Sequence, residues 1–268
     1  MAEDKIYGMP VGDLHKDDAK KSNGNTHSVV ETYEGWYSLH SVYRINWRRL
    51  ADKSDKWRKN ALAEFKKFLA AMEDNYQKHE GGYALYHATG HKGDLLFWFL
   101  RPSLEDLNAV ETQLHKLQIN QVLEQRESFV SVIEVSNYFN ADINHPKVQA
   151  RLYPVIPRRQ YMCFYPMSKK RDGTDNWYMT DKSDRARLMR SHGMIGKKYE
   201  GVINEYTTSA CGLDDWEWGI TLMGDDAVQF KKIVYEMRFD EVSARFGLFG
   251  PFVVGSLMND DVLDSLFL

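Results

Sequence analysis

The sequence contains little cysteine and no long hydrophobic run. Two of its 268 residues are cysteines, Cys163 and Cys211, and their spacing fits no metal-binding motif. Two isolated thiols are typical of a reducing compartment rather than of a disulfide-rich secreted protein. The first thirty residues are polar, and no stretch of about 18 apolar residues occurs. We therefore expect neither a signal peptide nor a membrane span, and we expect a cytoplasmic protein.

A strong excess of charge is also missing, as are several familiar catalytic motifs. The formal net charge is -3, which provides no strong field to recruit nucleic acid or anionic lipid. The sequence has no glycine-rich dinucleotide or phosphate loop, no serine nucleophile elbow and no H-E-x-x-H zinc motif. These absences give little support to nucleotide-dependent or serine-hydrolase chemistry.

The composition is otherwise that of a globular protein, with an excess of aromatic residues. Hydrophobic residues make up 43% of the chain and aromatic residues 13%, including seven Trp and fifteen Tyr. This excess suits a flat apolar ligand pocket, and it suits a large sheet core equally well. The polar segment 1–32 is expected to be a disordered tail.

After this tail, one order of elements occurs twice. The first half has predicted strands at 36–45, 83–89, 95–100 and 129–135, with amphipathic helices beginning near Ser54 and after Ser103. The second half has predicted strands at 161–165, 202–210, 216–222 and 249–255, with helices at 184–192, ended by Gly193, and at 227–237. Each half is thus β-α-β-β-α-β, the ferredoxin-like order.

Two ferredoxin-like halves can hide their bare sheet faces against each other. We place the halves at 33–139 and 161–268, joined by a connector at 140–160. Three prolines in the connector suit a linker between independent domains, whereas its apolar residues 152–156 suit packing against the body. We favour the fused arrangement, an α+β fold in which the two halves form one dimeric α+β barrel.

His192 is the first residue that could carry chemistry. It lies at the end of a predicted amphipathic helix, on the same face as Leu188 and Met189. An imidazole facing an apolar surface can ligate an iron axially, with its other nitrogen held by an acceptor. The alternative is a histidine that interacts with the last carbonyls of its helix.

A second candidate is the segment 164–171, which starts in an apolar strand and becomes strongly basic within a few residues. Tyr165 offers a phenol and Lys169 a cation, so the strand end suits a carboxylate-bearing ligand beside an oxidisable ring. Arg238 and Ser243, near the end of a later helix, could meet a second carboxylate. The alternatives are a strand that ends in a solvated loop and an arginine at a helix C-terminus.

Taken in order, several stretches resemble the coprohaem decarboxylase branch of the chlorite dismutase-like family, in its Firmicute-type form. The similarity covers nearly everything from about Thr32 to the C-terminus, and it is most specific in the blocks 164–167 and 229–247. The matching stretches are 35–37, 151–154, 161–171, 176–179, 189–194, 212–219 and 229–247.

The resemblance implies a haem-dependent reaction. Members convert iron coproporphyrin III (coprohaem), which is both substrate and cofactor, to haem b. They oxidatively decarboxylate two propionates to vinyls with hydrogen peroxide. His192 matches the proximal iron ligand, Tyr165 the tyrosine that becomes a radical, and Lys169 the lysine beside the reactive propionate.

The resemblance also implies binding residues and an assembly. Arg151, Arg238 and Ser243 match propionate-binding positions, and Met167 matches a pocket residue near the porphyrin. The family fold is a dimeric α+β barrel within each subunit, and members commonly form homopentamers.

One position departs from the family pattern. Where Firmicute-type members carry a distal glutamine, this sequence has Glu205, a carboxylate that either accepts a proton from peroxide or points away. Chlorite dismutation relies on a distal arginine near this place, and no arginine occurs between Arg190 and Arg238. Alternatives to the decarboxylase are a chlorite dismutase- or peroxidase-like haem protein, a non-enzymatic haem carrier or sensor, and a cofactor-free monooxygenase-like barrel.

Overall fold

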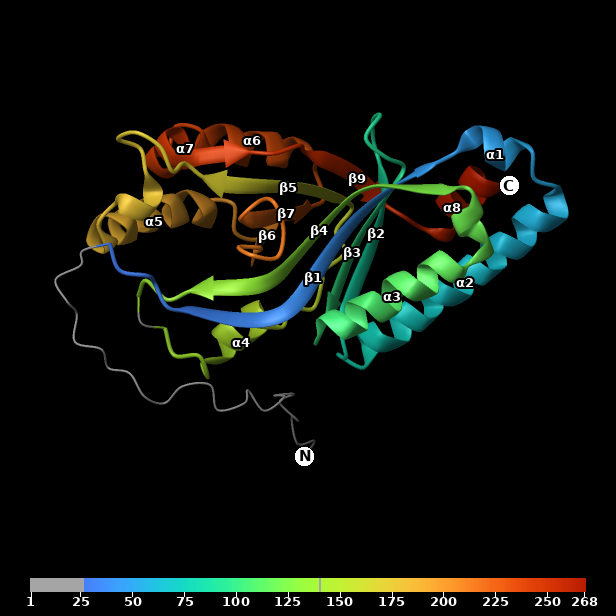
Figure 1. Cartoon of the computed structure of the whole chain (residues 1–268), viewed down its shortest axis with the longest axis horizontal. Helices are drawn as coiled ribbons and strands as arrows, with labels where there is room; N and C mark the ends of the chain where they lie inside the picture. Colours follow the sequence, from blue (N-terminus) through green and yellow to red (C-terminus); the bar gives the residue numbers. More distant parts are fainter. Residues whose placement is uncertain (1–26, 140) are drawn as a thin grey trace.

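The computed structural model describes residues 27–139 and 141–268, and Figure 1 shows the arrangement of their elements. The expected disordered tail lies, up to residue 26, outside the described residues. Its last predicted residue, Thr32, already belongs to a strand. Just before this strand, the carbonyl of Ser28 accepts a hydrogen bond from Arg185, so the chain is attached to the second half of the molecule here.

The elements follow the predicted order, with several additions. The first half contains β1 (Thr32–Ile45), α1 (Trp47–Ala51), α2 (Asp55–Gln77), β2 (Gly82–Ala88), β3 (Leu95–Arg101), α3 (Leu104–Lys116), the 3-10 turn η1 (Gln118–Gln121) and β4 (Leu123–Ser136). After α4 (Pro146–Leu152), the second half contains β5 (Tyr161–Lys169), η2 (Trp177–Met179), α5 (Lys182–Lys197), β6 (Ile203–Ser209), β7 (Trp218–Gly224), α6 (Val228–Met237), α7 (Glu241–Phe246), β8 (Gly247–Phe249), β9 (Val253–Leu257) and α8 (Asp260–Phe267).

Serine caps begin the two long helices of the first half where the sequence predicted. The Ser54 hydroxyl accepts the backbone N–H of Trp57 at 3.2 Å, and the Ser103 hydroxyl accepts that of Asp106 at 3.1 Å. Each cap satisfies one of the backbone donors that a helix start leaves unpaired.

The strands form one antiparallel sheet that closes on itself. Its order is β7-β6-β4-β1-β3-β2-β9-β5-β8, and β5 also pairs with β7. The first half therefore contributes β4-β1-β3-β2, the second contributes β6-β7-β5-β9, and the two are joined where β4 meets β6 and β2 meets β9. This confirms the predicted α+β barrel. The residue boundaries of the halves at 139 and 161 stay a prediction.

Alternation along the strands separates two surfaces of the sheet. The barrel interior is filled from both halves, for example by Trp98 of β3 and Phe164 of β5. On the outer face of the first half, α2, α3 and α8 cover a second core that includes Phe65, Phe97 and Phe99. On the outer face of the second half, α6 contributes Phe230 and Ile233 to a smaller core. That face carries the strand residues singled out in the sequence.

Several predicted boundaries are wrong; β4, for example, begins at Leu123 and not at 129, and β5 ends at Lys169 and not at 165. The helix expected to stop at Gly193 continues to Lys197, because Gly193 keeps a negative φ and α5 packs against α6 and α7. Such packing outweighs the roughly 1 kcal/mol that glycine costs in a helix interior. The strand expected at 249–255 is split into β8 and β9 at Gly250 and Pro251. Proline has no N–H to donate to a ladder.

The connector is packed against the barrel. Its helix α4 lies on β1 and β4, where Val148 and Leu152 form a small core with Val135. α4 was not predicted, nor were α1, α7 and α8, all of eight residues or fewer. Short helices give too few turns for an apolar period to be recognised.

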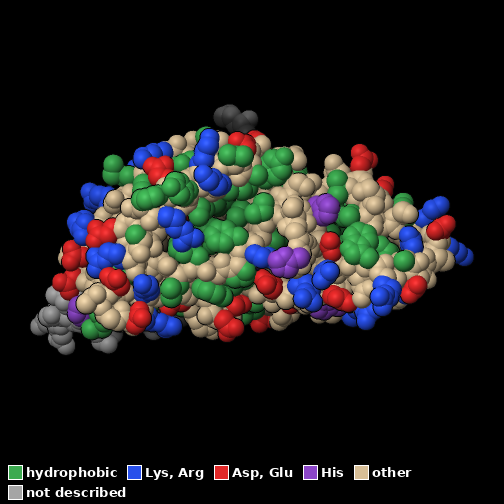
Figure 2. All heavy atoms as spheres, turned by 90° about the horizontal axis from the view of Figure 1, so that it is seen from above, with side chains coloured by type: hydrophobic (Ala, Val, Ile, Leu, Met, Phe, Trp, Pro, Cys, Tyr) green, Lys and Arg blue, Asp and Glu red, His purple; other side chains and the backbone are tan. Residues whose placement is uncertain are grey.

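The outer surface carries several exposed hydrophobic side chains. Figure 2 views the molecule from above Figure 1, the side of α6 and α7, and shows hydrophobic side chains gathered there with Lys and Arg among them. Val228, Tyr235, Phe239 and Leu248 are exposed in this half. Within residues 27–139 and 141–268, we find no helix that combines the length and apolar character needed to cross a bilayer.

The contact between Gly35 of β1 and α4 provides a test of the fold. A Cβ at position 35 would lie 2.0 Å from the carbonyl oxygen of Leu152. We expect Gly35→Ala to lower the free energy of unfolding by about 1–3 kcal/mol, because α4 would have to shift. Chemical denaturation measures this, with Glu34→Ala as the exposed neighbouring control. Equal stability of the two variants would contradict the close approach.

Candidate active site

Three of the predicted residues project from one face of β5. Side chains alternate along a strand, so Tyr165, Met167 and Lys169 share the outer face. Tyr165 pairs with Ile220 and Met167 with Trp218 of β7. Tyr165 and Met167 belong to the core beneath α6.

Tyr165 is enclosed by aromatic rings. It is 7% exposed, and its ring stacks on Phe252 with a centroid distance of 4.2 Å and an interplanar angle of 21°. The Phe249 ring lies 6.0 Å away. Burial raises the pKa of Tyr165 well above its usual value, the charges of Glu205 and Cys163 raise it further, and Arg238 opposes them. Tyr165 is therefore an uncharged phenol at neutral pH.

Arg238 stands beside this aromatic cluster. It caps the C-terminus of α6, and its guanidinium carbon lies 3.6 Å from the centroid of the Phe249 ring. Its side chain is otherwise exposed. The stacking fixes the guanidinium near Tyr165 and leaves its N–H groups free to meet an anion.

His192 is held by a buried carboxylate. Leu188 of α5 packs against Val242 and Phe246 of α7, and His192 follows one turn later on the same face. Its Nδ1 lies 2.8 Å from Oδ2 of Asp240, whose side chain is 2% exposed. With Nδ1 held in this way, Nε2 is the nitrogen left to bind a metal, as is usual for ligating histidines.

Asp240 is ionised despite its burial. Burial raises its pKa, but the hydrogen bond and charge of His192, with the N–H groups of Ser243 and Val242, lower it below the usual value overall. The helix α7 begins directly after Asp240, and Ser243 is buried in its first turn. The start of α7 thus stabilises the carboxylate that orients the imidazole.

Lys169 lies at the other end of the β5 row. Burial lowers its pKa from 10.5 to about 8, while the charges of Asp240 and Glu217 oppose this shift. Its ammonium is 5.1 Å from the centroid of the Trp177 ring. Asp240 therefore interacts electrostatically with both Lys169 and His192, which the sequence did not reveal.

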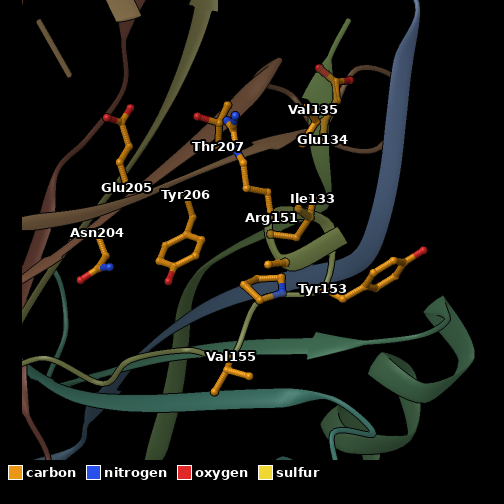
Figure 3. A pocket seen from close by; sticks show the side chains of 12 residues that line it. Ile133, Glu134, Val135, Arg151, Tyr153, Val155, Asn204, Glu205, Tyr206 and Thr207 are labelled. Atoms are coloured by element: carbon orange, nitrogen blue, oxygen red, sulfur yellow. The ribbon is translucent and has the colours of Figure 1, made fainter. Parts of the chain in front are cut away.

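Arg151 and Glu205 line one cavity of about 430 Å³. It lies where β4 and β6 separate, because these strands pair only at residues 132–133 and 208–209. Figure 3 shows Arg151 extending from α4 toward Thr207, and Glu205 and Tyr206 pointing to opposite sides of β6. The other predicted site residues lie beyond the lining of this cavity.

Glu205 is the electrostatic centre of the candidate site. Its carboxylate is exposed to the cavity, but protein surrounds it on most sides. Burial raises its pKa, and the positive charges of His192 and Arg151 oppose that rise. Glu205 also acts on Tyr165. Glu205 thus interacts electrostatically with the phenol, the imidazole and the Arg151 guanidinium.

Glycines leave room beside α5. A Cβ at Gly193 would meet nothing within 4 Å, and one at Gly196 would meet only Met237 Cε at 3.8 Å and Glu205 Oε2 at 4.0 Å. Within the described part of the chain, no side chain therefore packs tightly against α5 at Gly193 or at Gly196, one turn after His192. The Glu205 carboxylate reaches toward this space from β6.

Sequence reasoning missed two contributors to the site, Asp240 and Phe252. A signal for Asp240 existed, since an aspartate that precedes a short helix is a common N-cap. No comparable signal exists for Phe252, whose role depends on the segment between β8 and β9 folding over Tyr165.

Comparison with known proteins identifies relatives of this chain. The sequence model of a family described as chlorite dismutase matches residues 58–258. The coproheme decarboxylase of Staphylococcus carnosus (strain TM300) is 47% identical over 244 residues, which cover 89% of this chain and 98% of that protein.

Two solved structures are also similar. A haem-binding protein from Thermus thermophilus superposes with a TM-score of 0.87 at 42% identity, over 89% of this chain and 97% of that one. A mutant chlorite dismutase from Candidatus Nitrospira defluvii gives a TM-score of 0.73 at 18% identity, over 88% and 97% of the two chains. The second likeness supports the fold alone.

The lowered pKa of Lys169 can be measured directly. After reductive methylation with ¹³C-formaldehyde, we expect one dimethyl-lysine resonance, absent in Lys169→Ala, to titrate near pH 8. Because burial disfavours the ammonium, the proton is bound below about pH 8 and lost above it. A titration near the ordinary lysine value would show that water solvates this ammonium freely.

Proposed function

The chain belongs to the chlorite dismutase family, and we propose from this membership that it is a coprohaem decarboxylase. It would oxidise two propionates of iron coproporphyrin III to vinyls with hydrogen peroxide and release haem b. The observation that carries this proposal is the 47% identity to a coproheme decarboxylase over 98% of that enzyme's length. The grouping of a phenol, a carboxylate-held imidazole and several cations supports it.

The residues present fit an iron porphyrin. His192 offers Nε2 to the iron because Asp240 holds Nδ1. Gly193 and Gly196 leave space beside α5 for a flat ring. Arg151, Lys169 and Arg238 supply positive charge for propionates. The porphyrin, when bound, supplies the redox chemistry that lets peroxide act as a two-electron oxidant.

Tyr165 is suited to remove hydrogen from the substrate. A buried, protonated phenol gives up its electron and proton together, and its oxygen can then take a hydrogen atom from the propionate methylene next to the ring. Loss of one more electron and of carbon dioxide leaves the vinyl group. Each such conversion consumes one peroxide and one proton and releases two waters, and it occurs twice per porphyrin.

The cations set which propionate reaches Tyr165. Lys169 shares the outer face of β5 with Tyr165, so its ammonium would hold a carboxylate on the same face as the phenol. Arg151 on α4 and Arg238 on α6 come from other elements, and with Ser243 they would hold the remaining propionates. Met167, between Tyr165 and Lys169 on β5, would contact the porphyrin.

Glu205 would act on the peroxide. Burial raises its pKa, which favours uptake of a proton by the carboxylate, and its Oε2 would lie 4.0 Å from a Cβ at Gly196 of α5. A cytoplasmic location and a homopentameric assembly belong to the same proposal, since they are what the family resemblance implies.

Replacement of Tyr165 tests the radical role. We expect Tyr165→Phe to bind coprohaem with an unchanged Soret shift and to form vinyl product at least about 100-fold more slowly, because phenylalanine lacks the phenolic O–H whose hydrogen is lost. Mass spectrometry of the porphyrin after peroxide addition detects each lost carboxyl group. Tyr161→Phe, on the same face of β5, is the matched control. Normal turnover by Tyr165→Phe would exclude the role.

Replacement of His192 and Asp240 tests the iron ligand. We expect His192→Ala to weaken coprohaem binding and change its absorption spectrum. Asp240→Asn should keep the ligand but lower affinity by about 10-fold or more, because the hydrogen bond that orients the ring is altered. Titration of each apoprotein with ferric coprohaem measures both effects. An unchanged spectrum in His192→Ala would show that another group binds the iron.

A further inference from the structure

The turn between β2 and β3 carries a lysine across the join between the halves. The backbone N–H of Thr89 donates to the carbonyl of Val254 at 2.8 Å, and Ala88 pairs with Gly255. Beyond this pairing, the Lys92 ammonium donates to the backbone carbonyl of Phe252 at 2.5 Å. A side chain of the first half thus binds the segment that closes over the candidate site of the second.

The base of this turn is fixed. The backbone N–H of Asp94 donates to the Tyr43 carbonyl at 2.8 Å, and the Asp94 carboxylate accepts the backbone N–H of Ile45 at 2.7 Å. A Cβ at Gly93 would lie 2.3 Å from a methyl group of Val42, so the turn lies directly on β1. Lys92 therefore extends from a rigid support.

Phe252 belongs to the irregular stretch between β8 and β9. Before it, the backbone N–H of Gly250 donates to the Pro166 carbonyl at 2.8 Å; after it, Val253 pairs with Phe164. Between these anchors, the hydrogen bond from Lys92 holds the Phe252 carbonyl. Hydrogen bonds with a charged donor are stronger than those between neutral groups.

The Phe252 ring is the stacking partner of Tyr165. Their centroids are 4.2 Å apart and their planes differ by 21°. Lys92 also acts on the pKa of Cys163, which lies two residues before Tyr165 on the same face of β5. This effect agrees with a Lys92 ammonium that lies behind the Phe252 ring. Burial raises the pKa of the Cys163 thiol, and the nearby Lys92 charge opposes that rise.

We propose that Lys92 is a positioning residue for Tyr165, acting through the Phe252 carbonyl and ring. The inference rests on the role of Tyr165 in the proposed function. Hydrogen-atom transfer depends on how the phenol is aimed at the substrate, and small displacements of a reacting group lower rates steeply. The N-terminal half thereby contributes to the orientation of a ring that belongs to the other half.

The first experiment reads the Tyr165 ring without turnover. Nitration of the ligand-free protein by tetranitromethane, quantified for the Tyr165 peptide by mass spectrometry, reports how well the ring is covered. We expect Lys92→Met to raise the Tyr165 nitration rate about threefold or more, since a released Phe252 uncovers the phenol. Phe252→Leu should change it in the same direction. Lys92→Arg, which keeps the donor, should stay near wild type.

The second experiment separates positioning from binding. In single turnovers with bound coprohaem and peroxide, we expect Lys92→Met to lower the decarboxylation rate about tenfold with an unchanged dissociation constant for coprohaem. Lys92→Arg should restore most of the rate. His91→Ala, an exposed neighbour in the same turn, is the control for damage to the turn itself.

The outcomes are distinguishable. The inference is overturned if Lys92→Met resembles wild type in both experiments, or if His91→Ala produces the same changes. It is also overturned if Lys92→Met affects only coprohaem affinity. Absence of vinyl product from the wild-type protein would instead remove the proposed function, and the nitration experiment would still show whether Lys92 fixes the ring.

Discussion

The alternation of side chains along β5 is the constraint on which the rest of the structure depends. β5 pairs with β7 on one edge and with β9 and β8 on the other, so it closes the barrel. Its inward residues, such as Phe164, fill the interior. Its outward residues, Tyr165 and Lys169, face the side of α6 and α7. One strand therefore closes the fold and presents the reactive phenol. A shift of β5 by one residue would exchange its inward and outward side chains and would disturb both functions.

Much of this architecture could be predicted from the sequence, because strong local patterns coincide with it. The serine caps at Ser54 and Ser103, the apolar period of α2 and the repeated order of elements give the two ferredoxin-like halves. The family resemblance then supplied the residues for the site. In the structure, Glu205 interacts electrostatically with Tyr165, His192 and Arg151. Their roles in binding and chemistry follow from the proposal and not from the fold alone.

What could not be predicted depends on contacts between distant segments. The end of α5 was placed too early at Gly193, because packing on α6 and α7 is invisible to a local stop signal. Asp240 acquires its role only when the start of α7 meets His192, 48 positions earlier in the chain. The lowered pKa of Lys169 likewise arises from burial that no sequence window contains. Such effects are properties of the assembled core.

The two copies of the internal repeat cover their outer sheet faces differently. In the first half, α2 lies directly on the sheet and fills the space with Phe65 and Phe68. Its counterpart in the second half, α5, packs against other helices, and glycines leave open the side next to His192. The two copies thus differ in how closely their first long helix packs on the sheet. Backbone amides in the first copy should exchange with solvent more slowly than those of α5, because opening free energy follows the density of buried contacts.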